Sequence, residues 1–316
     1  MIDKGYDLDA IIETGMSVKS DESNRLYDRF RGRIMFPIRD SRGRCIAFGG
    51  RSLDPAARAK YLNSPETPLF DKGSNLYNLV SARSAVGRGE PLIVTEGYMD
   101  VIALDSGNFN GAIAPLGTAI TEKQLQLMWR ISPEPIIALD GDKAGLRAAY
   151  RLIDLSLPLL RTGKALRFSI MPEGKDPDDL IRNEGASIFK NLIDEAVPMV
   201  DLIWKREIEG KSFDSPERRA GLDKSLSDVI ALIKEKNLKN HYRDALFQAR
   251  RQFFGRQNTG KTEFKGNFRL MPQSDTKSSF LVAADEKTVS AQIRESTVIA
   301  VLINFPELIE IFYDEL

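Results

Sequence analysis

Short apolar segments alternate with helix-patterned segments between residues 91 and 170, and this alternation limits the fold more than any other feature of the chain. The apolar runs 91–95, 111–116, 135–139 and 166–170 are predicted strands. Helices are predicted between them, over residues 98–106, 121–130 and 143–160, with a bend near Pro158. Continuous apolar strands separated by helices are typical of a mostly parallel sheet that is covered on both faces. We therefore predict an α/β fold built on such a sheet.

The segments on either side of this region carry different patterns. Residues 1–88 mix short apolar runs with turns, and the runs 33–40 and 44–49 predict a hairpin. Residues 179–256 are almost wholly helical in pattern. We therefore expect a small α+β subdomain (1–88), the sheet domain (89–178) and a helical subdomain (179–256). A polar linker (257–285) and the first helices of a further domain (286–316), cut at the end of the chain, complete the expected order.

Composition excludes several classes of function. Lys+Arg and Asp+Glu both total 45, so the chain has no overall basic charge, although residues 21–63 hold ten basic and five acidic side chains. With only Cys45 and His241, the chain can form neither an internal disulfide nor a Cys/His zinc site. No apolar run is long enough to span a membrane, and the N-terminal sequence MIDKGYDLDA is not a secretion signal. We therefore expect no membrane contact, a cytoplasmic location, and chemistry based on carboxylates, basic side chains, tyrosines or bound metal.

Carboxylates follow three of the predicted strands. Glu96 follows the first strand, Asp140 and Asp142 follow the third, and Asp176 and Asp178 follow the fourth. Because ligands of open α/β sheets bind at the carboxyl ends of the strands, we expect these acids to lie at one edge of the sheet. Each acid taken singly also has a structural interpretation, as a helix cap or a turn residue. Their position on three strand ends of one sheet favours the functional interpretation.

A group of converging acids predicts a metal site. Carboxylates that lie close together repel one another unless cations neutralise them. Mg²⁺ suits such a site, because it binds few carboxylates and keeps waters that substrate phosphates can replace. Two ions about 4 Å apart would activate an attacking hydroxyl and stabilise an in-line phosphoryl transfer.

The motifs that carry these acids resemble a known fold. The segments TEGYMDVIAL and ALDGDKAG resemble the Toprim fold of topoisomerases and bacterial primases. The resemblance is closer to the bacterial replicative DNA primases, because further blocks stand in that family's order and spacing: RFRGRIMFPIRDSRGRCIAFGGR, KYLNSPETPLFDKG, LGTA and EGKDPDDLI. It is tight over residues 25–185 and loose as far as residue 256. The sheet domain is therefore expected to be a Toprim domain.

The resemblance implies a role for each group of residues. Glu96, Asp140 and Asp142 would be the catalytic acids, and with Asp176 and Asp178 they would bind Mg²⁺ or Mn²⁺, supported by Gly97, Asp100 and Gly141. The residues implied in nucleotide and DNA binding are Arg29, Arg31, Arg33, Arg51, Lys60, Tyr61, Asn63 and Lys72. Basic side chains supply the charge that phosphates require, and Tyr61 can stack on a base. Glu96 is also a candidate general base, a role that the sequence does not separate from metal binding.

The activity implied by the resemblance is that of a DNA primase, a DNA-directed RNA polymerase that makes RNA primers for replication. Its implied partners are single-stranded DNA, ribonucleoside triphosphates and a replicative helicase, the last through the domain that begins at residue 286. The family's N-terminal zinc-binding domain is not expected, because the chain lacks its cysteines. Two alternatives stay open: another Toprim enzyme, such as a topoisomerase or nuclease, and a non-catalytic replication-scaffold fragment.

Overall fold

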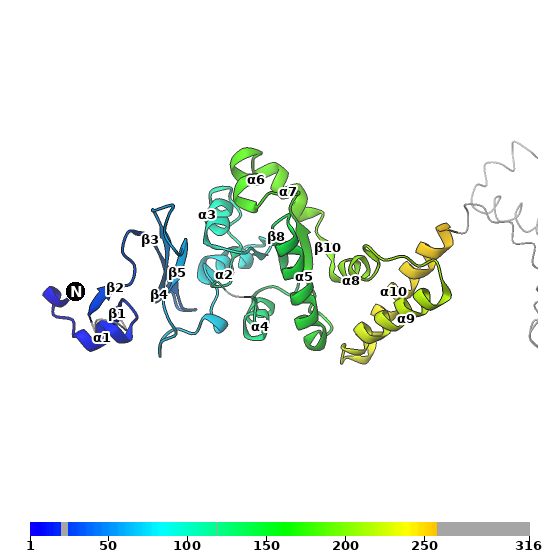
Figure 1. The fold of residues 1–316 in the computed structure, drawn as a ribbon, viewed down its shortest axis with the longest axis horizontal. Helices are drawn as coiled ribbons and strands as arrows, with labels where there is room; N and C mark the ends of the chain where they lie inside the picture. The colour runs from blue at the N-terminus through cyan, green and yellow to red at the C-terminus, as the bar shows by residue number, and fades with distance from the viewer. Residues whose placement is uncertain (20–24, 118, 258–316) are drawn as a thin grey trace, which may run out of the picture. The chain divides into compact units, whose positions relative to one another are not determined.

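The computed structural model describes residues 1–19, 25–117 and 119–257, which belong to one compact unit (Figure 1). The predicted domain 286–316 and the predicted linker, apart from Gln257, lie outside the described residues. Within the described residues, no helix is both long enough and apolar enough to cross a membrane.

The central sheet has five strands in the order β10-β9-β8-β6-β7. Four parallel strands confirm the four predicted ones, with shorter bounds: β6 (Ile93–Val94), β7 (Ala112–Ile113), β8 (Ile136–Leu139) and β9 (Arg167–Ile170). A fifth strand, β10 (Val197–Pro198), pairs antiparallel with β9 in a segment that was predicted to be helical. Pro198 lacks the N–H that an inner strand would need, and this strand lies at the sheet edge.

Helices cover both faces of the central sheet, as the apolar strands predicted. Along β8, Ile137 and Leu139 pack into one core and Ala138 packs into the other, because successive side chains of a strand point to opposite faces. The helices on the Ile137 face are α2 (Leu79–Gly87), α4 (Glu122–Ile131) and α5 (Lys143–Ser156). The helices on the Ala138 face are α3 (Tyr98–Ser106), α6 (Pro177–Asn183) and α7 (Ala186–Asp194).

Local signals account for the ends of these helices. The bounds of α3 are those predicted, and α4 begins after Thr121, whose hydroxyl accepts a hydrogen bond from the backbone N–H of Gln124. The backbone N–H of Thr121 in turn donates to Gln124 Oε1, which completes a capping box. α5 ends at Ser156, earlier than predicted, and the short turn η3 (Leu157–Leu159) follows. Pro158 has no N–H to continue the helical hydrogen bonds.

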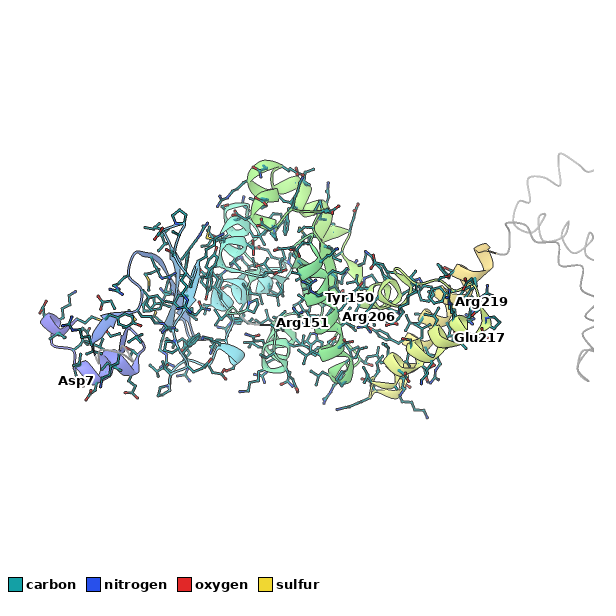
Figure 2. All side chains as sticks on the ribbon, viewed as in Figure 1. Asp7, Tyr150, Arg151, Arg206, Glu217 and Arg219 are labelled. Atoms are coloured by element: carbon teal, nitrogen blue, oxygen red, sulfur yellow. The ribbon has the colours of Figure 1, made fainter. Side chains whose placement is uncertain are left out.

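Three further helices extend the core on the α5 side: α8 (Met199–Ile208), α9 (Pro216–Ala231) and α10 (Lys236–Gln257). They confirm the helical prediction for this region. Arg206 of α8 forms a 2.7 Å ion pair with Asp154 of α5 and lies over the Tyr150 ring of the same helix (Figure 2). Glu207 is buried, but it accepts a hydrogen bond from Ser225 and pairs with Arg206, so its charge is compensated.

The N-terminal part contains the predicted hairpin and several short elements. The strands β3 (Arg33–Arg39) and β4 (Cys45–Ser52) form the hairpin, and Asp40 accepts the backbone N–H groups of Arg42 and Arg44 in its turn. A third antiparallel strand, β5 (Tyr61–Asn63), pairs with β4. The remaining elements are η1 (Ile2–Lys4), α1 (Leu8–Glu13), β1 (Ser17–Lys19), β2 (Leu26–Asp28) and η2 (Lys72–Ser74).

Tyr98, at the start of α3, joins the three-stranded sheet to the central sheet. Its ring stacks on Phe36 of β3, with 5.4 Å between ring centroids, and meets Tyr77 edge to face at 4.7 Å. Gly49 of β4 permits this approach, because a Cβ there would lie 2.8 Å from the Tyr98 ring. The two sheets therefore share a small aromatic core.

Two helical glycines give a matched test of the packing at the start of α5. Gly145→Ala should lower the free energy of unfolding by about 2 kcal/mol, because its Cβ would lie 2.3 Å from the carbonyl oxygen of Asp140. Gly221→Ala, with nothing within 4 Å of the added carbon, should raise it by about 0.5–1 kcal/mol. Urea unfolding measures both changes, and equal effects would contradict the close approach at Gly145.

Candidate metal and nucleotide site

The site lies where the chain leaves neighbouring strands of the central sheet toward opposite faces. β6 leads into α3 on one face, and its neighbour β8 leads into α5 on the other. Loops that diverge in this way leave a crevice at the carboxyl ends of the strands, which is where α/β sheets bind ligands. Glu96 follows β6 and Asp140 follows β8, so the two acids lie on either side of this crevice. Glu96 and Asp140 lie close together: the backbone N–H of Asp140 donates to Glu96 Oε1 at 3.4 Å.

Two of the predicted acids cap helices, which confirms the structural interpretation of these residues. Asp142 Oδ1 accepts the backbone N–H groups of Ala144 and Gly145, both at 2.7 Å, at the start of α5. Asp176 Oδ1 accepts the N–H of Asp179 at 2.6 Å at the start of α6. Each of these caps uses one carboxylate oxygen, so a cap does not prevent the second oxygen from binding a ligand.

Gly141 brings the ends of β8 and β9 together. A Cβ at this position would lie 1.9 Å from the carbonyl oxygen of Pro172, so only glycine permits the approach. The N–H of Gly141 donates to the carbonyl of Lys175 at 3.0 Å, which ties the two loops to each other. The loop after β8 is therefore held against the loop that carries Asp176 and Asp178.

Burial and mutual repulsion raise the pKa values of the acids at this edge. Burial, followed by the negative charges of Glu96 and Asp176, raises the pKa of Asp140 to about 7. Burial, followed by Asp140, likewise raises the pKa of Asp100 to about 7. Burial also raises the pKa of Asp178, although Arg182 lies 2.6 Å from its carboxylate. Removing these charges from water without a cation is therefore unfavourable.

The donor atoms at this edge suit a hard metal ion. Asp140 Oδ1 is buried and, among the described residues, has no hydrogen-bond partner. The surrounding ligand atoms are carboxylate oxygens, which Mg²⁺ and Mn²⁺ prefer. In the conformation described, no three acids converge closely enough to hold one ion, within residues 1–19, 25–117 and 119–257.

A cleft of about 380 Å³ brings basic residues from the N-terminal part over these acids. Arg51, Lys60 and Tyr61 line one side, and Glu96, Asp100, Asp140, Asp176 and Asp178 line the other. The Tyr61 side chain is 41% exposed, with Arg51 and Lys60 each 5.9 Å from its ring centroid. The cleft therefore offers positive charge, an aromatic ring and carboxylates together.

Two arginines that the resemblance implies in DNA binding donate to carbonyl groups of β5 and of the residues just before it. Arg29 donates twice to the carbonyl oxygen of Asn63, at 3.1 and 2.9 Å. Arg33 donates to the carbonyl oxygens of Ala59 and Lys60, at 2.9 and 3.3 Å. Neither lines the cleft. In this structure these bonds position β5, which begins at Tyr61, and the residues just before it, which include Lys60.

The other predicted binding residues have separate surroundings. Arg31 lies 5.1 Å from the ring centroid of Tyr27, and Lys72 lies in η2, so both are outside the lining of the cleft. Gly97 and Asp100, which were predicted to support the acids, bond to each other: Asp100 Oδ2 accepts the backbone N–H of Gly97 at 3.0 Å. This bond fixes the turn that follows Glu96.

Sequence reasoning missed the positioning role of Tyr98. Its hydroxyl donates to Asn63 Oδ1 at 2.6 Å, and Asn63 Nδ2 donates to the carbonyl oxygen of Leu116 at 2.9 Å. The Asn63 amide thus bridges β5 to the turn after Glu96 and to the segment after β7. Tyr98 stands two residues after Glu96 in the sequence, but no local pattern indicates a partner 35 residues earlier.

Comparisons with known proteins match two successive parts of the chain to two family models. Residues 1–83 match the model of the DNA primase catalytic core, N-terminal domain, and residues 90–168 match the Toprim domain. Among curated proteins, the chain is similar to the DNA primase of Rickettsia felis, with 41% identity over 240 residues, and that of Escherichia coli K12, with 41% over 237. These matches cover 76% and 75% of this chain, which spans 40% of the length of each relative.

Solved structures resemble the fold over a similar share of the chain. A crystal structure of a DNA primase domain from Pseudomonas aeruginosa has a TM-score of 0.73 and 41% identity, covering 77% of both chains. The DnaG primase catalytic domain bound to single-stranded DNA has a TM-score of 0.71 and 39% identity, covering 77% of this chain and 79% of that one.

The raised pKa of Asp140 predicts a pH-dependent loss of stability in metal-free buffer. Its native state holds a proton that the unfolded state loses near pH 4, so stability falls as the pH rises toward 7. The amide of the Asp140→Asn variant does not titrate, so the variant should not share this loss. Relative to wild type, the free energy of unfolding of Asp140→Asn should therefore be higher at pH 8 than at pH 4.5, by about 2 kcal/mol after allowance for solvent screening. Urea unfolding at the two pH values measures this difference, and a constant difference would contradict the burial of the Asp140 charge.

The Tyr98–Asn63 bond predicts a specific cost for losing one hydroxyl. Tyr98→Phe should lower the free energy of unfolding by about 1–2 kcal/mol, because Asn63 Oδ1 loses its donor while the ring packing is kept. Tyr6→Phe, at a side chain that is 58% exposed, is the matched control and should change it by less than about 0.5 kcal/mol. Denaturant titrations of both variants measure the costs, and equal stability of the two would refute the bridge.

Proposed function

The chain belongs to the DNA primase family, and we propose that residues 1–257 form the catalytic core of a DNA-directed RNA polymerase that makes primers on single-stranded DNA. The reaction joins the 3′-hydroxyl of one ribonucleotide to the α-phosphorus of the next and releases pyrophosphate. One observation supports this most directly: a single cleft places Arg51, Lys60 and Tyr61 opposite the acids of the central sheet. A polymerase needs cations for the triphosphate and acids for metal in the same place.

The acids are proposed to hold Mg²⁺ or Mn²⁺. Glu96, Asp140 and Asp142 would be the principal ligands, with Asp176 and Asp178 completing the group. Such ions, when bound, activate the attacking hydroxyl and neutralise charge on the reacting phosphate. The caps of α5 and α6 and the close approach at Gly141 fix the backbone that carries these acids. The unpartnered Asp140 Oδ1 supports the proposal, since a cation would satisfy it.

The basic side of the cleft is proposed to bind the incoming nucleotide and the template. Arg51 and Lys60 supply positive charge for the triphosphate, which the carboxylates alone would repel. The exposed ring of Tyr61 gives a base a surface on which to stack without sequence preference. Arg29 and Arg33 act on substrate indirectly, because they hold β5 and with it Lys60 and Tyr61.

Partners and domain roles follow from the same family membership. A DnaG catalytic domain similar to this chain is described as bound to single-stranded DNA, and we propose the same template here. A replicative helicase is the proposed partner of the domain from residue 286, which lies outside the described residues. We also propose the division into subdomains 1–88, 89–178 and 179–256, and action in the cytoplasm, at the replication fork.

A gel assay for RNA synthesis tests the proposed function. The whole chain is incubated with single-stranded DNA, labelled ribonucleoside triphosphates and Mg²⁺ or Mn²⁺. Asp142→Asn should reduce template-dependent RNA by about 100-fold or more, because asparagine keeps the helix cap but lacks the charge that a metal needs. Asp201→Asn, the same change at an exposed residue of α8, is the control and should leave synthesis unchanged.

Each other outcome points to a different conclusion. Synthesis unaffected by Asp142→Asn would refute the role of that acid. Binding of nucleotide and DNA by the wild type without RNA product would favour the replication-scaffold alternative. A covalent protein–DNA adduct in the same reaction would favour a topoisomerase.

A further inference from the structure

Gln124 of α4 is fully buried, and its side-chain amide makes more hydrogen bonds than the cap of that helix requires. Oε1 accepts the backbone N–H of Thr121, which is the cap itself. Nε2 donates to the carbonyl oxygens of Lys72 and Asn75, at 2.9 and 2.8 Å, in a segment 52 and 49 residues earlier. Glutamate completes a capping box as well as glutamine does, but only the amide can donate to two carbonyls. The donating half of Gln124 therefore serves the segment around η2 and is not needed for α4.

Other residues in the first turn of α4 hold the same segment. The Thr121 hydroxyl donates to the carbonyl oxygen of Gly73, and Lys123 pairs with the Asp71 carboxylate at 3.3 Å. These bonds use the backbone of η2 or the Asp71 side chain, and none of them uses the ammonium group of Lys72. The backbone at Lys72 is thus fixed from α4 while its side-chain charge stays available.

The surroundings of Lys72 leave its positive charge uncompensated. The residue is half-buried, and within the described part of the chain no acidic side chain forms an ion pair with its ammonium. Glu66 accepts the backbone N–H of Lys72, at 3.2 Å, and not the ammonium. A free cation on a fixed backbone is the kind of group that contacts nucleic-acid phosphates and sets the register of a strand.

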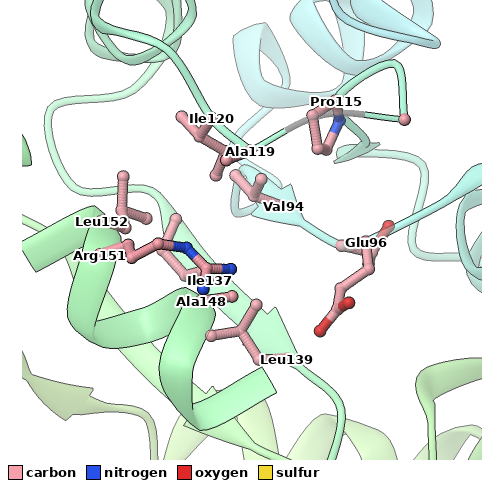
Figure 3. Close-up of a pocket in the computed structure, with 12 residues that line it drawn as sticks. Val94, Glu96, Pro115, Ala119, Ile120, Ile137, Leu139, Ala148, Arg151 and Leu152 are labelled. Carbon is pink, nitrogen blue, oxygen red and sulfur yellow. The ribbon is translucent and has the colours of Figure 1, made fainter. Parts of the chain in front are cut away.

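The contacts with α4 hold Lys72 at the edge of the sheet that carries the acids. α4 follows β7, which runs parallel to β6, so the first turn of α4 lies toward the carboxyl edge. Pro115 and Gly117, between β7 and α4, line the cleft together with Glu96. Figure 3 shows Pro115 and Ile120 near the end of β6, from which the chain leads into Glu96. Lys72 itself does not line the cleft, so a phosphate that it binds lies outside.

We propose that Gln124 is a positioning residue for the DNA template, and that it holds η2 so that Lys72 contacts a phosphate of the strand outside the cleft. The inference rests on the proposed function, because it extends the basic side of the cleft along the template. The incoming triphosphate is the less favoured ligand of Lys72, since Arg51 and Lys60 line the cleft and Lys72 does not. Gln124 touches no substrate and acts through Lys72.

Binding of a labelled single-stranded oligonucleotide to the whole chain, followed by fluorescence anisotropy over a series of salt concentrations, tests this role. Gln124→Met, similar in size but without an amide, should weaken binding by about fivefold. It should also reduce the slope of log affinity against log salt by about 0.7, because one phosphate contact is lost. Gln126→Met, the same change at an exposed position of α4, is the matched control and should bind as wild type does.

A double-mutant cycle tests whether Gln124 acts through Lys72. Lys72→Ala should weaken binding and reduce the salt slope as Gln124→Met does, and Gln124→Met should add no further loss in the Lys72→Ala protein. Gln124→Glu, which keeps an acceptor for the cap but has no amide, is a second variant and should reduce the slope in the same way. Ser225→Ala removes a hydrogen bond to the buried Glu207, so it controls for lowered stability and should leave the slope unchanged.

The outcomes separate this inference from the proposed function. No binding of the oligonucleotide by wild type would contradict the proposed function itself. Binding by wild type that Lys72→Ala or Gln124→Met leaves unchanged would overturn the inference alone, and so would a full effect of Gln124→Met in the Lys72→Ala protein. Weaker binding with an unchanged salt slope would indicate a purely structural role for Gln124 and would also overturn it.

Discussion

The parallel pairing of β6, β8 and β9 brings negatively charged carboxylates together at one edge of the sheet. The rest of the structure has to offset the repulsion between them. Glu96, Asp140 and Asp176 follow these strands, so the sheet places their carboxylates at one edge. The raised pKa of Asp140 records the unfavourable energy of this arrangement. Apolar cores on both faces of the sheet offset it, because they fix the strands whether or not the acids are neutralised. A stable scaffold can therefore hold carboxylates that repel one another at one edge of the sheet.

The basic side of the cleft depends on the contact between the three-stranded sheet and the central sheet. Phe36, Tyr98 and Tyr77 form its apolar part, and the Tyr98–Asn63 hydrogen bond forms its polar part. This joint carries β5 to the carboxyl edge of the central sheet, so that Lys60 and Tyr61 face the acids. The basic side of the cleft is therefore positioned by contacts between residues that lie far apart in the sequence.

Several elements were predictable because their signals are local. The bounds of α3, the Thr121 cap of α4 and the hairpin of β3 and β4 follow from spacing, capping chemistry and turn residues within a few positions. β10 was predicted to be helical, since its pairing with β9 depends on a chain reversal that no local pattern specifies. The end of α5 was predictable only in part. Pro158 indicated where the helix changes, but not whether it bends or ends there.

The sequence by itself determined the strand–helix alternation, the acids at the strand ends and the family, because these depend on residue type and spacing along the chain. Only the tertiary structure decided what each polar side chain does. The resemblance implies that Arg29 and Arg33 bind DNA, a prediction that stays open; the structure shows that they donate to carbonyl groups of Asn63 and Ala59, and that the Asn63 side chain accepts from Tyr98. A side chain's function depends on which group lies within about 3 Å of it, and long-range packing sets that distance.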